Sequence, residues 1–255
     1  KMKRAQEQGT AGRPYSEKIT QVLVDLAALP QAVKASHPLL ERREVSKIAI
    51  IHITADRGLC SGLNANVNRI TANFTLEQSV PVTLITVGRR GRNFMARYGR
   101  DIRAEFTDIS DKPSLLDTLP ISHIVIDDYT NRLVDQVYIA YTRFVTTMTQ
   151  HPVMEQLLPV EPAERKTGGP ADYIYEPNDH TVLSELLPRF VEMQIYHAIL
   201  ESIASEQSAR MVAMRSATEN AKELIQDLTL IYNKARQEMI TKELSDIMGG
   251  AIAIS

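Results

Sequence analysis

The feature that most constrains the fold of this chain is a long stretch near its end that holds no helix breaker. Residues Arg189 to Met248 contain neither proline nor glycine and are rich in Glu, Ala, Leu, Met, Lys and Arg, which favour helix. One helix over the whole stretch would be about 90 Å long, whereas a compact domain of this chain length has a radius of gyration of about 18 Å. We therefore predict a single projecting helix. Two or three core helices joined by turns are the alternative.

Apolar residues recur along this stretch at alternating steps of three and four. Such spacing is typical of a coiled-coil seam, which needs a partner helix. The seam residues are Met214, Ala217, Ala221, Leu224, Leu228, Ile231 and Ala235. Two oppositely charged pairs, Glu206 with Arg210 and Glu238 with Lys242, are spaced four residues apart. We expect both pairs on the exposed sides of the helix.

A similar apolar spacing occurs near the start of the chain, within residues 1–40. Its members are Ile19, Val22, Leu26, Leu29 and Val33. Glycines and prolines in the same segment predict a bend or local loosening. We expect this segment and the C-terminal helix, residues 183–255, to form a long antiparallel coiled coil. The chain begins with neither an initiator Met nor a helix cap, so we also expect further helical residues before Lys1.

The middle of the chain, residues 45–162, has the pattern of an α/β domain. The apolar runs 47–54 and 81–87 are typical of buried parallel strands. Each run leads through a glycine-bearing turn into a helix, at about 63–74 and ending near Tyr98, which predicts a Rossmann-like βαβ domain with a mostly parallel sheet.

The remainder of the middle region predicts one more helix and an outer hairpin. Residues 113–134 favour helix, although 123–126 alone would pass for a strand. Residues 137–148 and 153–160 favour two paired strands. Prolines and glycines then predict a loop, at about 163–182, that returns the chain to the long helix.

Composition excludes several classes of function. A net charge of −2 gives no broad field for nucleic acid. The single Cys60 allows no internal disulfide and no zinc cluster. No run reaches the roughly 18 apolar residues of a membrane-spanning helix, and no signal peptide is visible, so any membrane association should be peripheral.

The turn after the first strand is a candidate binding site, and a purely structural turn is the alternative. Gly58 and Gly62 stand between a strand and a helix, where a phosphate can bind. The turn lacks both the dinucleotide and the Walker fingerprints, so a structural turn is the better interpretation. Asp56 beside Arg57 predicts a local ion pair or a subunit contact. Cys60 is better interpreted as a buried packing thiol than as a reactive one.

The other polar candidates also favour structural roles. His52 lies inside an apolar strand and is interpreted as a hydrogen-bonded core residue. Asp127 and Asp128 have no second carboxylate cluster nearby, which makes a metal site improbable. Six arginines predict a basic surface patch: Arg89, Arg90, Arg92, Arg97, Arg100 and Arg103. No nucleophile, base and orienting group occur together, so we predict no active site and no cofactor.

The last residues form an apolar tip without charge, IMGGAIAIS from Ile247. An exposed apolar tip needs a partner surface around it. This favours a shaft inserted into an apolar sleeve.

Three segments resemble the γ subunit of F-type ATP synthase, and the resemblance covers essentially the whole chain. The most specific is Ile240 to Ala251 (ITKELSDIMGGA), and Asp56 to Asn64 (DRGLCSGLN) and Ala204 to Asn220 (ASEQSARMVAMRSATEN) agree with it. The chain departs from the family at Gly249-Gly250, where one small residue and one glycine are more usual. Thiol regulation like that of chloroplast relatives is not expected, because their dithiol insertion is missing.

The resemblance implies a rotor shaft that has no catalysis of its own. Its coiled coil would turn inside a ring of three α and three β subunits, while the α/β body and the ε subunit rest on the membrane c-ring. Proton flow would then drive ATP synthesis through torque. The protein would be peripheral, on the cytoplasmic face of a bacterial plasma membrane, with the matrix face of the mitochondrial inner membrane as the alternative.

The resemblance also implies roles for particular residues. Arg236 and Gln237, with Thr241, match positions that contact the β subunits. Ile247, Met248, Ile252 and Ile254 would form the apolar tip in the sleeve. Tyr173, Tyr175 and Glu176 would contact the rotor ring and ε.

Two other functions remain open on the residues alone. A nucleotide-dependent enzyme would use the 56–62 turn, and a free coiled-coil scaffold would form a homo-oligomer through the seam.

Overall fold

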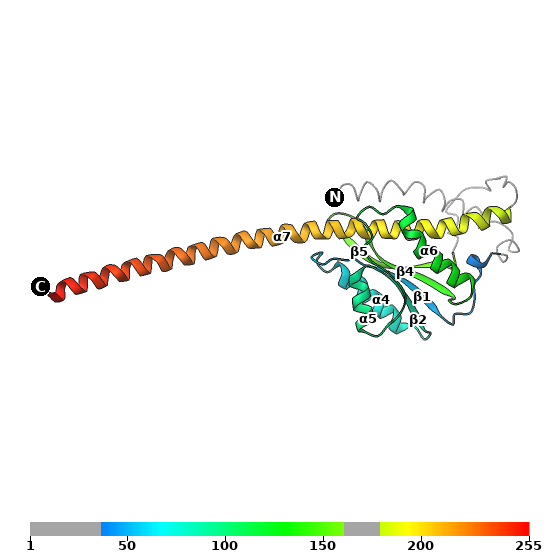
Figure 1. Ribbon diagram of the computed structural model, residues 1–255, viewed down its shortest axis with the longest axis horizontal. Coiled ribbons are helices and arrows are strands. Elements are labelled where there is room, and N and C mark those ends of the chain that lie inside the picture. Colours follow the sequence, from blue (N-terminus) through cyan, green and yellow to red (C-terminus); the bar gives the residue numbers. More distant parts are fainter. Residues whose placement is uncertain (1–36, 161–178, 255) are drawn as a thin grey trace. The chain divides into compact units, whose positions relative to one another are not determined.

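The computed structural model describes the backbone of residues 37–160 and 179–254, and the side chains of 37–160 and 184–249 (Figure 1). The described residues fall into two compact units, one that ends at Arg210 and one that begins at Met211. The predicted N-terminal helix of the coiled coil, with Ile19, Val22, Leu26 and Leu29, lies outside the described residues. That half of the predicted coiled coil stays a prediction.

A five-stranded sheet forms the centre of the first unit. Its strands are β1 (Ile48–Ile53), β2 (Val82–Val87), β3 (Asp101–Phe106), β4 (Gln136–Phe144) and β5 (Gln150–Leu158). They are ordered β3-β2-β1-β4-β5. The first four pair in parallel and β5 pairs antiparallel with β4. The mostly parallel sheet predicted from the sequence is therefore confirmed.

The two faces of the sheet carry separate cores, and β1 supplies both. Ile48 and Ile50 point to the face covered by α4 (Leu63–Glu77) and α5 (Arg89–Arg97). Ile51 and Ile53 point to the opposite face, covered by α6 (Leu115–Thr130) and by the start of α7 (Asp179–Ile254). All six residues of β1 are buried. This explains its continuous apolar run, because a strand covered on both faces has no polar side.

Local signals fix where the helices begin. Gly88 precedes α5 with φ of 95°, and a Cβ there would lie 2.1 Å from the carbonyl oxygen of Thr54, so only glycine fits. Ser114 and Asp117 form a capping box at the start of α6. Residues 123–126 lie inside α6, so the helical interpretation of that stretch is correct. A short 3₁₀ helix, η1 (Pro38–Leu40), brings Leu39 into the core.

Two features of the sheet were missed or misplaced by the sequence analysis. β3 was not predicted, because its residues are alternately exposed and half-buried at the sheet edge and include Asp, Arg and Glu. β5 begins at Gln150, earlier than predicted, and includes Pro152. An edge strand tolerates proline because one side of its backbone has no partner strand.

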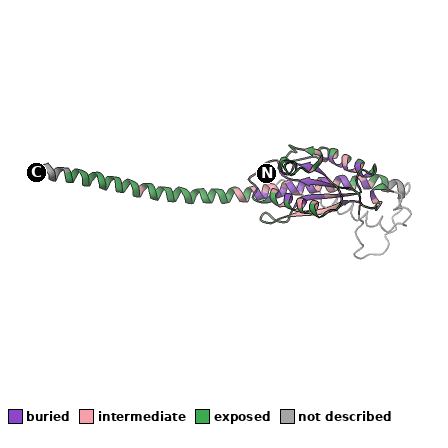
Figure 2. Cartoon of the chain, turned by 90° about the horizontal axis from the view of Figure 1, so that it is seen from below, coloured by how far each residue is buried: buried purple, intermediate pink, exposed green. Residues whose placement is uncertain are grey.

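α7 is one continuous helix of 76 residues. The predicted helix over 189–248 is confirmed, and the alternative of several shorter helices is wrong. The helix also contains Pro188 and Gly249 and ends at Ile254, so Gly249 does not terminate it. Its first part belongs to the core, with Leu187, Val191 and Ile195 fully buried. From Met211 to Gly249 nearly all of its residues are exposed (Figure 2).

Candidate interaction surfaces

The second unit presents the coiled-coil seam predicted from the sequence as an exposed apolar stripe. Met214 is 40%, Leu224 59%, Leu228 55% and Ile231 64% exposed. The alanines of the seam are exposed too. Burial of a large aliphatic side chain contributes about 1.5–3 kcal/mol. This helical surface therefore gains much stability from a partner that covers it.

Beyond the seam, the apolar side chains of the second unit cover a broader face of the helix. Met239, Ile240, Leu244, Ile247 and Met248 are all exposed. At about 100° per residue these five side chains occupy about half of the circumference of the helix, a broader face than a seam stripe. A broad exposed apolar face needs a correspondingly broad partner surface to cover it. The distribution suits a partner that encloses this end of the helix.

The three residues assigned to β-subunit contact lie on the same exposed segment. Arg236, Gln237 and Thr241 are all exposed. Gln237 and Thr241, four positions apart, share one side of the helix. The Thr241 hydroxyl donates a hydrogen bond of 2.9 Å to the Gln237 carbonyl oxygen. No ion pair or side-chain hydrogen bond joins Arg236 to another of the described residues. The guanidinium of Arg236 is thus available to a partner.

Several residues of the sequence-based assignments are not described by the structure. Tyr173, Tyr175 and Glu176 lie outside the described residues. Ile252 and Ile254 fall in the last turns of α7, where only the backbone is described. Their roles stay predictions.

The turn after β1 is held by its own side chains, as the structural interpretation predicts. Asn64 accepts a hydrogen bond from the Ala55 amide at 2.9 Å and donates one to the Arg57 carbonyl oxygen at 3.4 Å. Cys60 is 1% exposed and packs with Leu63 and Ala209. Burial raises the pKa of the Cys60 thiol, so the thiolate is disfavoured. The prediction of a packing thiol is confirmed.

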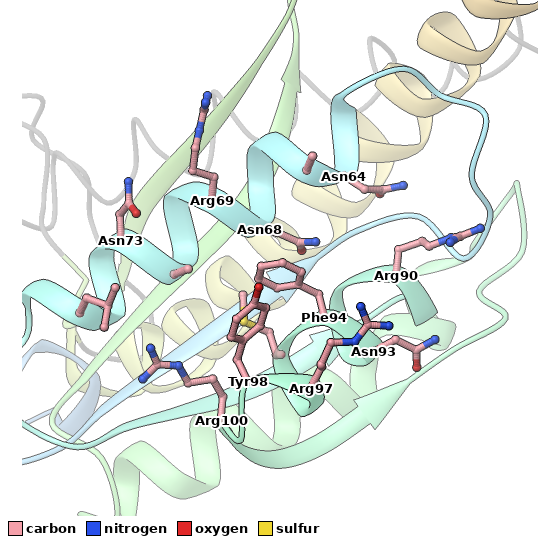
Figure 3. Close-up of a pocket in the computed structure, with 14 residues that line it drawn as sticks. Asn64, Asn68, Arg69, Asn73, Arg90, Asn93, Phe94, Arg97, Tyr98 and Arg100 are labelled. Carbon is pink, nitrogen blue, oxygen red and sulfur yellow. The ribbon is translucent and has the colours of Figure 1, made fainter.

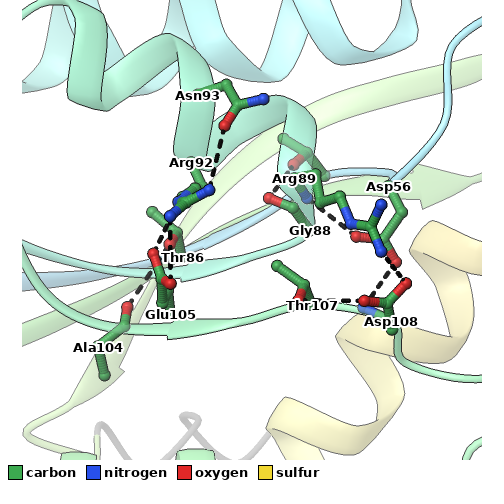
Figure 4. Close-up of polar contacts among 11 residues, drawn as sticks. Asp56, Thr86, Gly88, Arg89, Arg92, Asn93, Ala104, Glu105, Thr107 and Asp108 are labelled. Atoms are coloured by element: carbon green, nitrogen blue, oxygen red, sulfur yellow. Dashed lines mark hydrogen bonds and ion pairs between the residues drawn. The ribbon is translucent and has the colours of Figure 1, made fainter.

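Asp56 does not form the local ion pair with Arg57 that the sequence suggested. Its carboxylate accepts hydrogen bonds of 3.0 Å from the backbone amides of Arg89 and Asp108 (Figure 4). Arg89 in turn forms an ion pair with Asp108. The hydrogen bond from Arg89 lowers the pKa of the Asp108 carboxyl group. Asp56 therefore links the turns that follow three neighbouring strands.

The predicted basic patch is only partly correct, because carboxylates neutralise half of it. Arg92 contacts Glu105 at 2.7 Å (Figure 4), and Arg103 contacts Asp128 at 3.3 Å. Arg89 is paired as described above. These partners lie on β3, in the following loop and on α6, all distant in sequence. Arg90, Arg97 and Arg100 have no such carboxylate partner among the described residues.

His52 is a core residue, as predicted. Its Nδ1 lies 3.0 Å from the Thr71 hydroxyl oxygen and its Nε2 lies 2.9 Å from the Asn68 amide oxygen. The ring is fully buried, and burial lowers the pKa of His52 to about 4. The imidazole is neutral at pH 7 and serves to connect β1 with α4.

Glu206 and Arg210 form the predicted ion pair, but the expectation that this pair is exposed is wrong. The guanidinium contacts the carboxylate at 2.6 Å, and the side chains are only 16% and 24% exposed. Arg210 also reaches the Gly58 carbonyl oxygen at 3.3 Å. The other expected pair, Glu238 and Lys242, is exposed, and no ion pair joins these two residues.

Metal-binding clusters and membrane-spanning helices are both absent from the part of the chain that the structure describes. No group of His, Cys, Asp and Glu there is arranged to hold a metal ion. None of the helices described combines the length and apolar composition needed to cross a membrane.

Comparison with known proteins gives consistent matches along the chain. The sequence matches the ATP synthase family over residues 1–254. It is 64% identical over 255 residues to the ATP synthase gamma chain of Dehalococcoides mccartyi strain CBDB1, covering 100% of this chain and 90% of that relative. It is 46% identical over 258 residues to the gamma chain of Roseiflexus sp. strain RS-1, covering 100% and 89%.

Solved structures show the same fold. The central stalk and c-ring structure of the Tetrahymena thermophila mitochondrial ATP synthase includes a chain that matches with a TM-score of 0.65 and 21% identity, over 86% of this chain and 94% of that one. A chain of the Euglena gracilis mitochondrial ATP synthase matches with a TM-score of 0.63 and 20% identity, over 99% and 94%.

Proposed function

The chain belongs to the family of ATP synthase γ chains, and on this premise we propose that it is the rotor shaft of the central stalk. It transmits torque between a proton-driven membrane c-ring and the catalytic β subunits. In this role it needs no cofactor and catalyses no reaction by itself. The observation that carries the proposal is the single helix α7, whose second part is exposed and has a broad apolar face.

The exposed segment of α7 suits the inside of a ring of α and β subunits. An apolar helix that is enclosed by an apolar sleeve can turn without breaking many directional contacts. We assign Ile247, Met248, Ile252 and Ile254 to that sleeve. We assign the stripe of Met214, Leu224, Leu228 and Ile231 to a coiled coil with Ile19, Val22, Leu26 and Leu29, and such a coiled coil would stiffen the shaft.

Polar groups on the same helix would make the contacts that change during rotation. Arg236, Gln237 and Thr241 are assigned to the β subunits. A guanidinium offers a bidentate, charge-assisted contact to a carboxylate, and such a contact can break and form again at each catalytic site in turn.

The body of the protein would carry the connection to the membrane. Tyr173, Tyr175 and Glu176 are assigned to the rotor ring and the ε subunit. The two gamma chains reported above, which are far more similar in sequence than the mitochondrial chains, come from bacteria, and this supports a peripheral protein on the cytoplasmic face of a plasma membrane. The matrix face of a mitochondrial inner membrane is the alternative.

Co-purification with α and β subunits tests this function. The full chain and a chain truncated after Glu238 are each expressed with α and β, and a full chain with Arg215→Ala is the control, because Arg215 is exposed, pairs with Glu219 and belongs to none of the assigned contacts. We expect all three to join the complex and only the truncation after Glu238 to weaken coupled ATP synthesis strongly. Failure of the full chain to join the complex would contradict the proposal.

A further inference from the structure

A groove of about 680 Å³ lies between α4 and α5 on the body of the protein (Figure 3). One wall comes from α4, with Asn68 and Arg69, and the other from α5 and the residues that follow it, with Phe94, Arg97 and Tyr98. Small-molecule sites typically have volumes of about 300–1,000 Å³. The groove has the size of a ligand site, and none of the residues assigned to the rotor function lines it.

The groove concentrates positive charge that no carboxylate of the described residues neutralises. Arg69, Arg90, Arg97 and Arg100 line it, and its lining includes no Asp or Glu. Among the described residues, no ion pair joins any of these four guanidinium groups to a carboxylate. By contrast, the neighbouring Arg92 turns to the other side of α5 and pairs with Glu105. Like charges gathered in a concave surface attract an anion from solution.

An aromatic surface stands beside these charges. The rings of Phe94 and Tyr98 lie 4.8 Å apart between their centroids, at an angle of 47°. Tyr98 is 65% exposed. Figure 3 shows both rings between the two helices, with Arg97 on one side and Arg100 on the other. A planar group can pack on the exposed ring while a charged group reaches the guanidinium groups.

Buried side chains form the bottom of the groove. Asn68 is buried, and its amide oxygen is held by the His52 ring at 2.9 Å. The side chain of Met95, which belongs to α5, is also buried. A site whose base is fixed in this way loses little conformational freedom when a ligand binds.

We propose that the α4–α5 groove binds a nucleoside polyphosphate, with the phosphates on Arg97 and Arg100 and the base on Tyr98. Planar guanidinium groups suit phosphate because two N–H donors match two oxygens. Aromatic side chains stack on bases of any identity. An inorganic polyphosphate would satisfy the arginines but would leave the aromatic surface unused. This binding is independent of the rotor function and would occur on the isolated full chain.

Photolabelling of the full chain with 8-azido-ATP tests the site. Labelled residues are mapped by mass spectrometry, and ATP and tripolyphosphate are compared as competitors. We expect label on the peptides that carry residues 94–100, and we expect ATP to compete at least about tenfold better than tripolyphosphate because only ATP stacks. Label elsewhere or no label would overturn the site. Equal competition would overturn the nucleoside assignment.

Variants of the chain sharpen the test. The double substitution Arg97→Gln with Arg100→Gln should weaken ATP binding, measured by equilibrium dialysis, at least about tenfold. Arg92→Gln is the matched control, since it removes a cation from the same helix outside the groove. Tyr98→Leu should remove the advantage of ATP over tripolyphosphate. Far-ultraviolet circular dichroism verifies that each variant is folded. Unchanged binding in the folded double variant would refute the proposal.

Discussion

The guanidinium of Arg210 donates a hydrogen bond of 3.3 Å to the carbonyl oxygen of Gly58, which lies 152 positions earlier in the chain. Arg210 is the last residue of the first unit, and Gly58 lies in the turn between β1 and α4. The same guanidinium is held by Glu206 at 2.6 Å. Within the first unit, one charged side chain therefore joins α7 to the turn between β1 and α4.

We expect Arg210→Met to destabilise the protein by about 1–3 kcal/mol, because it leaves the Glu206 carboxylate and the Gly58 carbonyl oxygen without their donor. Urea unfolding of the full chain measures the loss. Burial raises the pKa of the Glu206 carboxyl group, and loss of Arg210 raises it further. Once the Glu206 carboxyl group is protonated, it no longer gains from the charge of Arg210. The difference in the free energy of unfolding between Arg210→Met and the unchanged protein should therefore shrink as the pH falls through the pKa of Glu206.

Arg215→Met is the matched control for this variant. Arg215 also pairs with a glutamate four residues away, Glu219, but both side chains are mostly exposed. Exposed pairs contribute about 0–1 kcal/mol. A loss of stability as large as that of Arg210→Met would show that burial of the Glu206 pair has no special role.

The buried His52 predicts a loss of stability in acid. Its pKa is about 4 in the folded protein, against 6.5 in an exposed histidine. Between these values the unfolded chain binds a proton that the folded chain does not, so stability falls as the pH decreases from about 6.5 to 4. The full effect is about 3 kcal/mol. Urea unfolding at several pH values measures it.

His52→Gln should flatten this part of the stability curve, since glutamine retains polar atoms near Asn68 and Thr71 but does not titrate. His151→Gln serves as the control because His151 is exposed on β5. The idea fails if the two variants have the same pH dependence.

Close packing of α5 on β1 makes Gly91 sensitive to a single methyl group. A Cβ at Gly91 would lie 2.5 Å from the His52 ring and 2.7 Å from the Thr54 hydroxyl oxygen. The Gly91 amide also donates to that hydroxyl at 2.8 Å. Gly91→Ala should therefore lower the free energy of unfolding by about 1–3 kcal/mol, as measured by thermal or urea unfolding.

Gly249→Ala should have the opposite effect and stabilise the helix. A Cβ there would meet no atom within 4 Å, and the residue lies in α7. Alanine favours helix over glycine by about 1 kcal/mol. Circular dichroism would show equal or higher helix content, and a loss of helix in Gly249→Ala would contradict this account.

The fold was predictable where the signal is local. The apolar runs of β1 and β2, each followed by a glycine-bearing turn, specify strand and helix within a few residues. The unbroken helix follows from a stretch without proline or glycine. β3 was missed because an edge strand with an exposed face resembles a polar loop in sequence.

The side-chain partners were much less predictable. Asp56 contacts backbone groups 33 and 52 positions away, and Arg103 meets Asp128 across 25 positions. Such pairs depend on how the strands and helices pack, which composition and spacing do not reveal. The groove between α4 and α5 arises in the same way. The arginines were visible in the sequence, but which of them lack carboxylate partners was not.

The last prediction concerns the contact assigned to Arg236. Arg236→Ala should reduce coupled ATP synthesis by the assembled complex up to about tenfold. A charge-assisted hydrogen bond contributes about 1.5–3 kcal/mol, and only part of this energy affects the rate-limiting step. Arg236→Lys keeps the charge but loses the planar fork, so an intermediate loss is expected. Arg215→Ala is the control, since Arg215 is already paired with Glu219. Co-purified α and β subunits must be equal in all variants. If Arg236→Ala retains full coupling in a complete complex, Arg236 is not the residue that engages the β subunits.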